Sequence, residues 1–179
     1  MAELRDFISL RIAVLTVSDT RTLADDKSGQ TLQDRIVAAG HAIADRQIVK
    51  DDVAAIRRVV KAWGTRTDID AIISTGGTGL TGRDVTVEAM RPLFEKEIEG
   101  FSTVFHMISF QKIGTSTVQS RATAGVMKGK YVFCLPGSPG ACRDAWDEIL
   151  KFQLDYRHPP CNFVEIMPRL EEHQKRRKV

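Results

Sequence analysis

The stretch that decides the fold is Ala71-Ile72-Ile73-Ser74-Thr75-Gly76-Gly77-Thr78-Gly79-Leu80-Thr81-Gly82. Its first part, 71–74, is a short apolar run, which predicts a strand buried on both faces, as strands of parallel sheets are. Its second part is a glycine-rich loop that directly follows the strand. Because open α/β sheets bind ligands outside the carboxyl ends of their strands, this stretch predicts both the sheet and the place of a site.

Outward from this stretch, strands and helices alternate. The run 12–17 predicts a buried strand, 41–49 a weaker one, and 121–127 with 131–135 an antiparallel hairpin around Lys128-Gly129. Between them we expect helices capped by Ser28 and by Asp51 or Asp52, a helix near 85–94 broken by Pro92, and an apolar helix 101–108. Alternation of this kind predicts a three-layer α/β/α sandwich with a mostly parallel central sheet and one antiparallel hairpin strand.

The overall composition fits one such domain. The chain has 179 residues, of which 42% are hydrophobic, and a formal net charge of only +3. We expect a domain over residues 1–165 and a polar, disordered tail over 166–179. No basic stripe precedes the tail and no apolar run is long enough to span a bilayer, so we expect no nucleic-acid or membrane partner. An odd number of cysteines and no secretory signal favour the cytoplasm.

The glycine loop matches two phosphate-binding patterns in part. It fits the GxGxxG of dinucleotide-binding proteins, but that motif should follow the first strand. It also fits the first glycines of a P-loop, but Arg83-Asp84 stand where Lys and Ser/Thr should follow. Both patterns use glycines to bring backbone N–H groups close to phosphate oxygens. We therefore predict a phosphorylated or nucleotide-like ligand here, with an unliganded tight turn as the alternative.

Other loops end at the same predicted edge of the sheet. They are the loop 18–21 and the loop 137–140, in which Ser138 and Pro139 also have the pattern of a helix start. Asp84, directly after the glycines, fits either a Mg²⁺ ligand beside phosphates or a helix cap. Asp51 and Asp52 have the same ambiguity: one caps a helix and the other is free, and the residues leave open which.

Histidine and cysteine chemistry finds no support in the sequence. None of the four histidines lies in a glycine loop, and no two have metal-ligand spacing: His41, His106, His158 and His173. His106 lies on a mostly apolar helix and Cys134 within an apolar strand, so both are interpreted as structural. No Ser/His/Asp or Cys/His arrangement is present.

The glycine loop and the residues that follow it resemble a known family. Ile73-Ser74-Thr75-Gly76-Gly77-Thr78-Gly79 followed by Arg83-Asp84-Val85-Thr86 is similar to the signature of the MoaB/MogA molybdenum-cofactor biosynthesis proteins. The resemblance runs from residue 11 to about 163 and is greatest to the MoaB branch. The supporting stretches are 99–101, 109–110, 113–117, 119–121 and 160–163.

The resemblance implies an activity and a set of site residues. Active relatives adenylylate molybdopterin with ATP and Mg²⁺ and release pyrophosphate, and the family forms homotrimers or homohexamers. Their two functional aspartates correspond to Asp51 and Asp84, the expected catalytic residues and Mg²⁺ ligands. The sheet-edge argument and the resemblance together predict ligand contacts by Ser18, Asp19, Thr75, Gly76, Gly77, Thr78, Gly79, Ser120, Arg121, Gly137, Ser138 and Pro139.

Two other functions are weighed against this one. The first is a non-catalytic oligomer that holds or delivers molybdopterin through the same loops. The second is an NAD-linked enzyme, which the lack of an acidic ribose-binding residue after a second strand argues against. For the adenylyl transfer the nucleophile would be a phosphate that is already anionic, so the absence of a convincing general base fits it.

Overall fold

The computed structural model describes residues 5–173 and contains one six-stranded sheet. The strand order is β2 (Ala42–Val49), β1 (Arg11–Val17), β3 (Ala71–Thr75), β6 (Lys130–Leu135), β5 (Thr123–Met127) and β4 (Lys96–Glu97). The first four strands pair in parallel, whereas β5 runs antiparallel to both of its neighbours. The mostly parallel sheet and its hairpin strand are therefore as predicted, and among the strands the two-residue β4 is the one that the sequence did not reveal.

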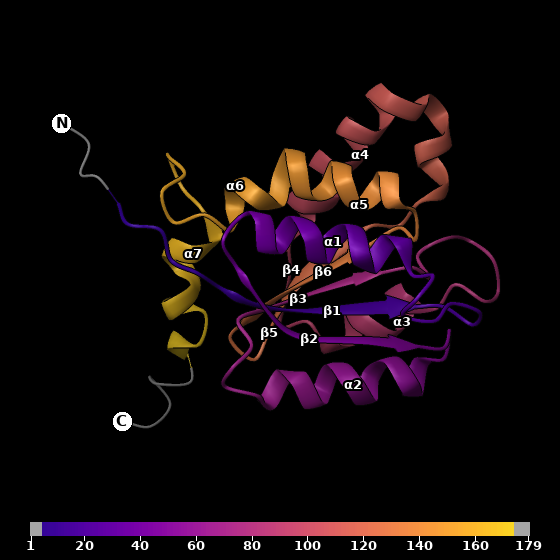
Figure 1. Cartoon of the computed structure of the whole chain (residues 1–179), viewed down its shortest axis with the longest axis horizontal. Coiled ribbons are helices and arrows are strands. Elements are labelled where there is room, and N and C mark those ends of the chain that lie inside the picture. Colours follow the sequence, from indigo (N-terminus) through magenta and orange to yellow (C-terminus); the bar gives the residue numbers. More distant parts are fainter. Residues whose placement is uncertain (1–4, 174–179) are drawn as a thin grey trace.

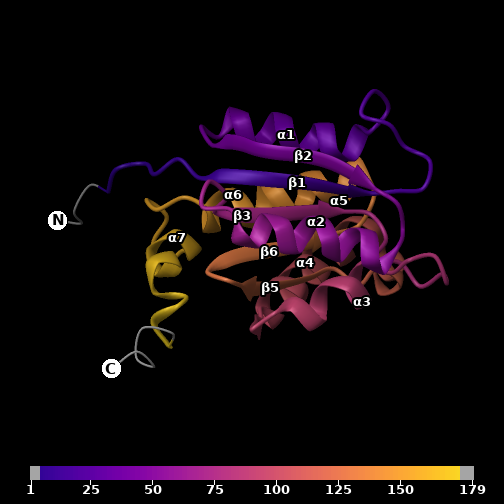
Figure 2. The same ribbon diagram turned by 90° about the horizontal axis from the view of Figure 1, so that it is seen from below.

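Helices cover both faces of the sheet, as Figures 1 and 2 show. One face carries α1 (Lys27–Ala38), α4 (Glu99–Ile113) and α5 (Pro139–Ala145); the other carries α2 (Val53–Thr65) and α3 (Thr86–Met90). Pro92 lies in a 3-10 turn (Arg91–Leu93) that ends α3, as expected. Beyond α5 the chain continues through a π-helical segment (Trp146–Leu150), which buries Trp146, Ile149 and Leu150, into α6 (Lys151–Gln153).

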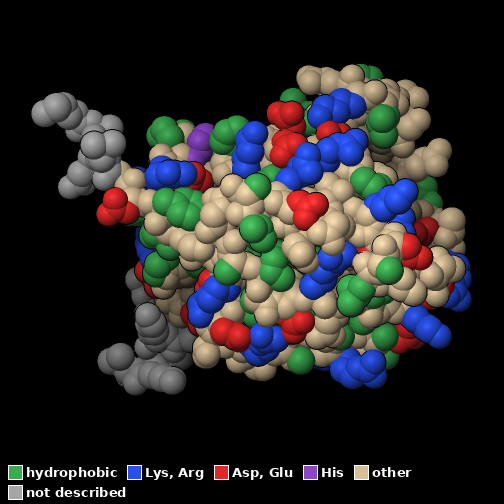
Figure 3. All heavy atoms as spheres, in the orientation of Figure 1, with side chains coloured by type: hydrophobic (Ala, Val, Ile, Leu, Met, Phe, Trp, Pro, Cys, Tyr) green, Lys and Arg blue, Asp and Glu red, His purple; other side chains and the backbone are tan. Residues whose placement is uncertain are grey.

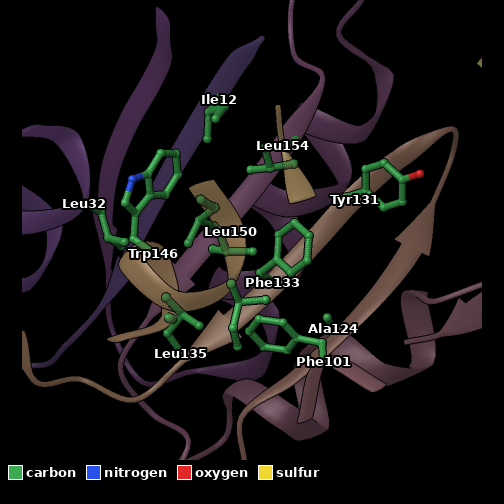
Figure 4. Packing of buried hydrophobic residues seen from close by; sticks show 14 of the residues in the cluster. Ile12, Leu32, Phe101, Ala124, Tyr131, Phe133, Leu135, Trp146, Leu150 and Leu154 are labelled. Carbon is green, nitrogen blue, oxygen red and sulfur yellow. The ribbon is translucent and has the colours of Figure 1, made fainter. Parts of the chain in front are cut away.

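Period-two alternation along the strands builds a core on each face of the sheet. In β1, Ile12 and Val14 join the core beneath α1, α4 and α5, while Ala13 and Leu15 join the core above α2. Figure 4 shows the first core, where Phe133 lies among Phe101, Leu150 and Leu135. All of β1 except Arg11 is buried, which is why its sequence is nearly continuous in apolar residues.

The cap of α1 corrects one sequence expectation. Asp26, not Ser28, is the N-cap residue, and its carboxylate accepts from the N–H of Gly29 at 2.9 Å. The same buried carboxylate accepts from the hydroxyl of Thr16 at 2.7 Å and from Nη2 of Arg46 at 3.1 Å. Ser28 lies inside the helix. The Asp26 side chain is the cap because it bonds at once to α1, to Thr16 of β1 and to Arg46.

Removal of the Asp26 carboxylate is expected to destabilise the fold strongly. Asp26→Ala leaves the guanidinium of Arg46, whose side chain is 12% exposed, without its buried partner, and breaking a buried pair from one side costs about 3–5 kcal/mol. Ser28→Ala removes only a hydroxyl, which is worth about 1 kcal/mol. Urea unfolding of both variants measures the difference, and equal losses would contradict the assignment of the cap.

The carboxyl-terminal boundary also differs from the expected one. The boundary at 165 falls inside α7 (Phe163–Ile166), which a 3-10 turn (Met167–Arg169) follows. Met167 and Leu170 pack against the core, so apolar burial carries the domain beyond 165. Of the predicted disordered tail, residues 174–179 lie outside the described part of the chain.

The surface shown in Figure 3 intersperses positive and negative side chains rather than collecting one sign. Among residues 5–173, no helix combines the length and the hydropathy needed to cross a bilayer. The expectations of no nucleic-acid or membrane partner and of a cytoplasmic location stay predictions.

Candidate functional site

Four chain segments meet at the carboxyl edge of the sheet, at the right of Figure 1. A Cβ atom placed on Gly77, after β3, would lie 2.8 Å from Oδ1 of Asp51, after β2. One placed on Gly137, after β6, would lie 3.1 Å from Cα of Gly76, and one on Gly76 would collide with the carbonyl oxygen of Val17, in β1. The structure thus brings the glycine loop against both Asp51 and Gly137, as the sheet-edge rule predicted.

The glycine loop needs glycine at its first two positions. Gly76 and Gly77 have φ of +101° and +65°, conformations that side chains with a Cβ rarely adopt. Thr86, the first residue of α3, holds them in place: its hydroxyl donates to the Gly76 carbonyl at 2.8 Å and its N–H to the Gly77 carbonyl at 2.9 Å. Within the described part of the chain, no acceptor meets the N–H groups of Gly77 and Thr78. They are therefore available to an anion.

A substitution at Gly77 is expected to damage the site, whereas one at Gly82 is not. Gly77→Ala forces a Cβ into the hydroxyl of Thr86 and against Asp51, and an Ala at positive φ costs about 1–3 kcal/mol. Gly82→Ala, in the same loop, meets no atom within 4 Å. Thermal melts and pyrophosphate-binding titrations of the two variants give the comparison. Equal behaviour of the two would show that the close packing at Gly77 has no consequence.

The structure separates the roles of Asp51 and Asp52. Asp52 is the N-cap of α2 and accepts from the N–H of Ala55 at 2.7 Å. Asp51 is left for the site, where burial, and then the neighbouring carboxylates of Asp19 and Asp84, raise the pKa of its carboxyl. Carboxylates gathered in this way create a negative potential that favours a cation between them.

Asp84 does not cap a helix. The N-cap of α3 is Val85, without a side-chain cap, so the capping alternative is wrong. The Asp84 carboxylate instead accepts from the hydroxyl and the N–H of Thr81, at 2.6 and 2.9 Å, and these bonds hold its pKa below the usual value. Asp84 is thus an anionic side chain fixed against the glycine loop.

A cavity of about 330 Å³ lies beside these groups. Its lining includes three residues that the sequence did not single out as ligand contacts, Ser116, Gln119 and Pro136, together with Gly77, Thr78, Gly79, Asp84, Ser120 and Gly137. The Ser120 hydroxyl is buried and has no hydrogen-bond partner among the described residues. The run of small polar residues in the 3-10 turn (Gly114–Gln119) was the signal for Ser116 and Gln119. A larger hollow of about 610 Å³ lies between β4 and the segment 166–173, away from the glycine loop.

Other predicted residues have local partners. Thr75 is buried, and its hydroxyl donates to the Pro136 carbonyl at 2.9 Å and lies 3.2 Å from Sγ of Cys142. Ser138 caps α5 through the N–H of Ala141, with Pro139 as the first helical residue, as expected.

The first loop is held by its own contacts. Ser18 accepts from the N–H of Arg21 at 3.2 Å. Asp19 forms an ion pair with Arg83, which holds its pKa low. Arg21 and Ser28 both donate to the Gly137 carbonyl, at 3.2 and 2.9 Å, and so tie the first loop to the third.

The carboxylates fit a metal ion only in part. Among residues 5–173, no group of three or more His, Cys, Asp or Glu side chains is arranged to hold a metal ion by itself. Asp51 and Asp84 nevertheless present oxygen ligands to one edge of the glycine loop, and Mg²⁺ is commonly held by one or two carboxylates together with substrate phosphates. The donor set fits a cation shared with a ligand.

Comparison with known proteins agrees with this geometry. Residues 13–156 match the family MoCF_biosynth, described as "Probable molybdopterin binding domain". The chain belongs to this family. It is 52% identical over 158 residues to Molybdenum cofactor biosynthesis protein B of Escherichia coli K12, with 88% of this chain and 93% of that protein covered. It is 46% identical over 149 residues to the protein of the same name from Halalkalibacterium halodurans, with 83% of this chain and 88% of that protein covered.

Solved structures of MoCF_biosynth relatives have the same fold. A crystal structure of Molybdenum cofactor biosynthesis protein B superimposes with a TM-score of 0.84 at 39% identity, covering 94% of this chain and 99% of that one. The tungsten cofactor synthesizing protein MoaB from Pyrococcus furiosus superimposes with a TM-score of 0.68 at 34% identity, covering 79% of this chain and 91% of that one. The MoaB/MogA resemblance seen in the sequence is confirmed, and the chain stands among the molybdenum cofactor biosynthesis proteins.

Proposed function

We propose that this chain binds molybdopterin at the carboxyl edge of its sheet and adenylylates it with ATP and Mg²⁺. One observation carries the proposal: the glycine loop with its free N–H groups and Asp84 line one cavity, and the carboxylate of Asp51 packs against Gly77 at the same edge of the sheet. Backbone N–H groups suit phosphate oxygens, and carboxylates suit the cation that accompanies them. Family membership supplies the pterin as the ligand class.

The reaction requires alignment of the two reacting phosphates more than acid–base catalysis. A terminal phosphate oxygen of molybdopterin attacks the α-phosphorus of ATP, the bond between that phosphorus and the bridging oxygen breaks, and pyrophosphate leaves. The nucleophile is anionic at neutral pH, so no general base is needed. The residues that would hold Mg²⁺ are Asp51 and Asp84, and the ion would neutralise the charge crowded on the phosphates. The N–H groups of Gly77 and Thr78 orient phosphate oxygens.

The direct test is pyrophosphate release from ATP by the purified protein. Release should depend on both molybdopterin and Mg²⁺, and omission of either should abolish it. ATP binding without molybdopterin-dependent release would contradict the adenylyl transfer.

A second candidate function is non-catalytic binding or delivery of molybdopterin. It is favoured by the local engagement of charged groups: Asp84 is bonded to Thr81, and Arg83 to Asp19. In this case the chain would bind molybdopterin tightly and release no pyrophosphate, so the same assay separates the two functions.

We also propose a homotrimer or homohexamer. The helix α4 and the turn after it expose an apolar row, with Met107 61%, Phe110 55%, Ile113 56% and Val118 74% accessible. These side chains are therefore not core residues, and large exposed apolar patches commonly mark protein interfaces. Light scattering at several concentrations tests the proposal, which a concentration-independent monomer would contradict.

A further inference from the structure

Arg121 was expected to contact the ligand, but its guanidinium is bound to the backbone of the glycine loop. Its Nε lies 2.9 Å from the carbonyl oxygen of Gly79 and 3.3 Å from that of Thr78. Its Nη2 donates to the Asp84 carbonyl at 3.1 Å, and both terminal nitrogens meet the carboxylate of Glu88. Arg121 does not line the cavity. With every nitrogen engaged, the guanidinium presents no free pair of donors to a phosphate.

These bonds set the direction of the peptide units in the loop. In a trans peptide, the carbonyl of one residue and the N–H of the next point in opposite directions. Thr86 draws the carbonyls of Gly76 and Gly77 to its side, and Arg121 does the same for the next two. The peptide units that Thr86 holds carry the free N–H groups of Gly77 and Thr78, and those that Arg121 holds carry the N–H groups of Gly79 and Leu80. The Gly79 N–H interacts with the carboxylate of Asp84, and Gly77, Thr78, Gly79 and Asp84 all line the cavity.

Glu88 fixes the direction of the guanidinium. It lies on α3, opposite the loop, and Arg57 of α2 secures that helix by donating to the Glu88 and Ala89 carbonyls at 3.0 Å each. The hydrogen bond from Arg121 lowers the pKa of the Glu88 carboxyl, so the partner stays anionic. On the other side, Nε2 of His106 lies 3.0 Å from the carbonyl oxygen of Ser120, directly before Arg121.

We propose that Arg121 is a positioning residue: held by Glu88, it fixes the orientation of two peptide units of the glycine loop and thereby the cavity wall that Thr78 and Gly79 form together with Asp84. The inference rests on the proposed phosphate-binding function of the loop. In this role Arg121 acts on the ligand through the backbone of the loop. Glu88 supports it, and the ion pair with Arg121 explains why a carboxylate lies close to an anion site.

Two variants separate positioning from direct contact, with inorganic pyrophosphate as the probe in calorimetric titrations. Arg121→Lys keeps the charge, which would serve a phosphate contact, but one nitrogen cannot reach the Gly79 and Asp84 carbonyls and Glu88 together. Positioning therefore predicts about tenfold weaker binding, as for the loss of one or two charge-assisted bonds. Glu88→Gln changes the pyrophosphate affinity in opposite directions under the two roles. Positioning predicts weaker binding, whereas direct contact predicts equal or tighter binding, because a carboxylate that competes for Arg121 is gone.

Amide hydrogen exchange provides the readout that needs no ligand. In both variants, exchange in the segment 76–84 should become faster than in the wild type, because the carbonyls lose their donor in Arg121→Lys and the donor loses its fixed direction in Glu88→Gln. Arg91→Lys is the matched control. Its guanidinium pairs with Glu97 on the exposed surface close to α3, so neither exchange in 76–84 nor pyrophosphate affinity should change.

The outcomes are distinct. Faster exchange together with weaker pyrophosphate binding by Glu88→Gln supports the proposal. Unchanged exchange in Arg121→Lys, or a Glu88→Gln variant that binds at least as tightly as the wild type, overturns it. A wild type that binds no pyrophosphate would count against the proposed function, while the exchange rates would still decide whether Arg121 holds the loop.

Discussion

Asp84→Asn is expected to lower molybdopterin-dependent pyrophosphate release by at least about a hundredfold, equivalent to roughly 2.7 kcal/mol in the barrier. The amide oxygen of the new side chain would still accept from the N–H and hydroxyl of Thr81, so the turn that Asp84 closes should survive. What is lost is the negative charge that would favour Mg²⁺ beside the phosphates. The variant should therefore melt within a few degrees of the wild type while turnover falls.

The control for Asp84→Asn is Thr81→Val, which removes the hydroxyl bond to Asp84 and leaves the charge. If the carboxylate acts only by closing the turn, Thr81→Val should lose turnover and Asp84→Asn should keep it. If its charge acts in catalysis, the order reverses. Wild-type turnover from a well-folded Asp84→Asn variant would exclude the catalytic role.

Asp51→Asn is expected to have an effect of similar size, at least about a hundredfold on turnover. The chain supplies the control in the next residue. Asp52→Asn changes the same group by the same atoms, but Asp52 caps α2, where Asn and Asp rank alike, so turnover and stability should stay near normal. Pyrophosphate release at saturating ATP and Mg²⁺, beside thermal melts, measures both.

Equal losses in Asp51→Asn and Asp52→Asn would show that charge near the amino end of α2 matters in general, and not a carboxylate in the site. A normal Asp51→Asn would remove Asp51 from the reaction. The comparison is sharp because the two side chains differ in their surroundings and not in their chemistry: one is packed toward Gly77 and the other bonds to its own helix.

Much of the fold was predictable because local rules and burial agree. The runs 12–17 and 71–74 are apolar except for the uncharged Thr16 and Ser74, so a sheet covered on both sides follows from them. Gly40 at positive φ after α1, Ser138-Pro139 at the start of α5 and Lys128-Gly129 in the hairpin follow from backbone chemistry at single positions. The place of the site followed from topology, since strands that run in parallel end together.

What only the tertiary structure decided is where the polar side chains of the site turn. Arg121 lies 42 residues along the chain from Gly79, and nothing near either residue shows that the guanidinium binds that carbonyl and not a ligand. The same holds for Thr75, which bonds to Pro136 inside the protein, and for Asp26, which replaces Ser28 as a cap because it also meets Arg46. The physical reason is that most buried donors and acceptors are paired, and their partners come from segments that only folding brings together. The sequence by itself determined the sheet, its edge and the residues available there; tertiary packing decided which of them face the ligand and which hold the others in place.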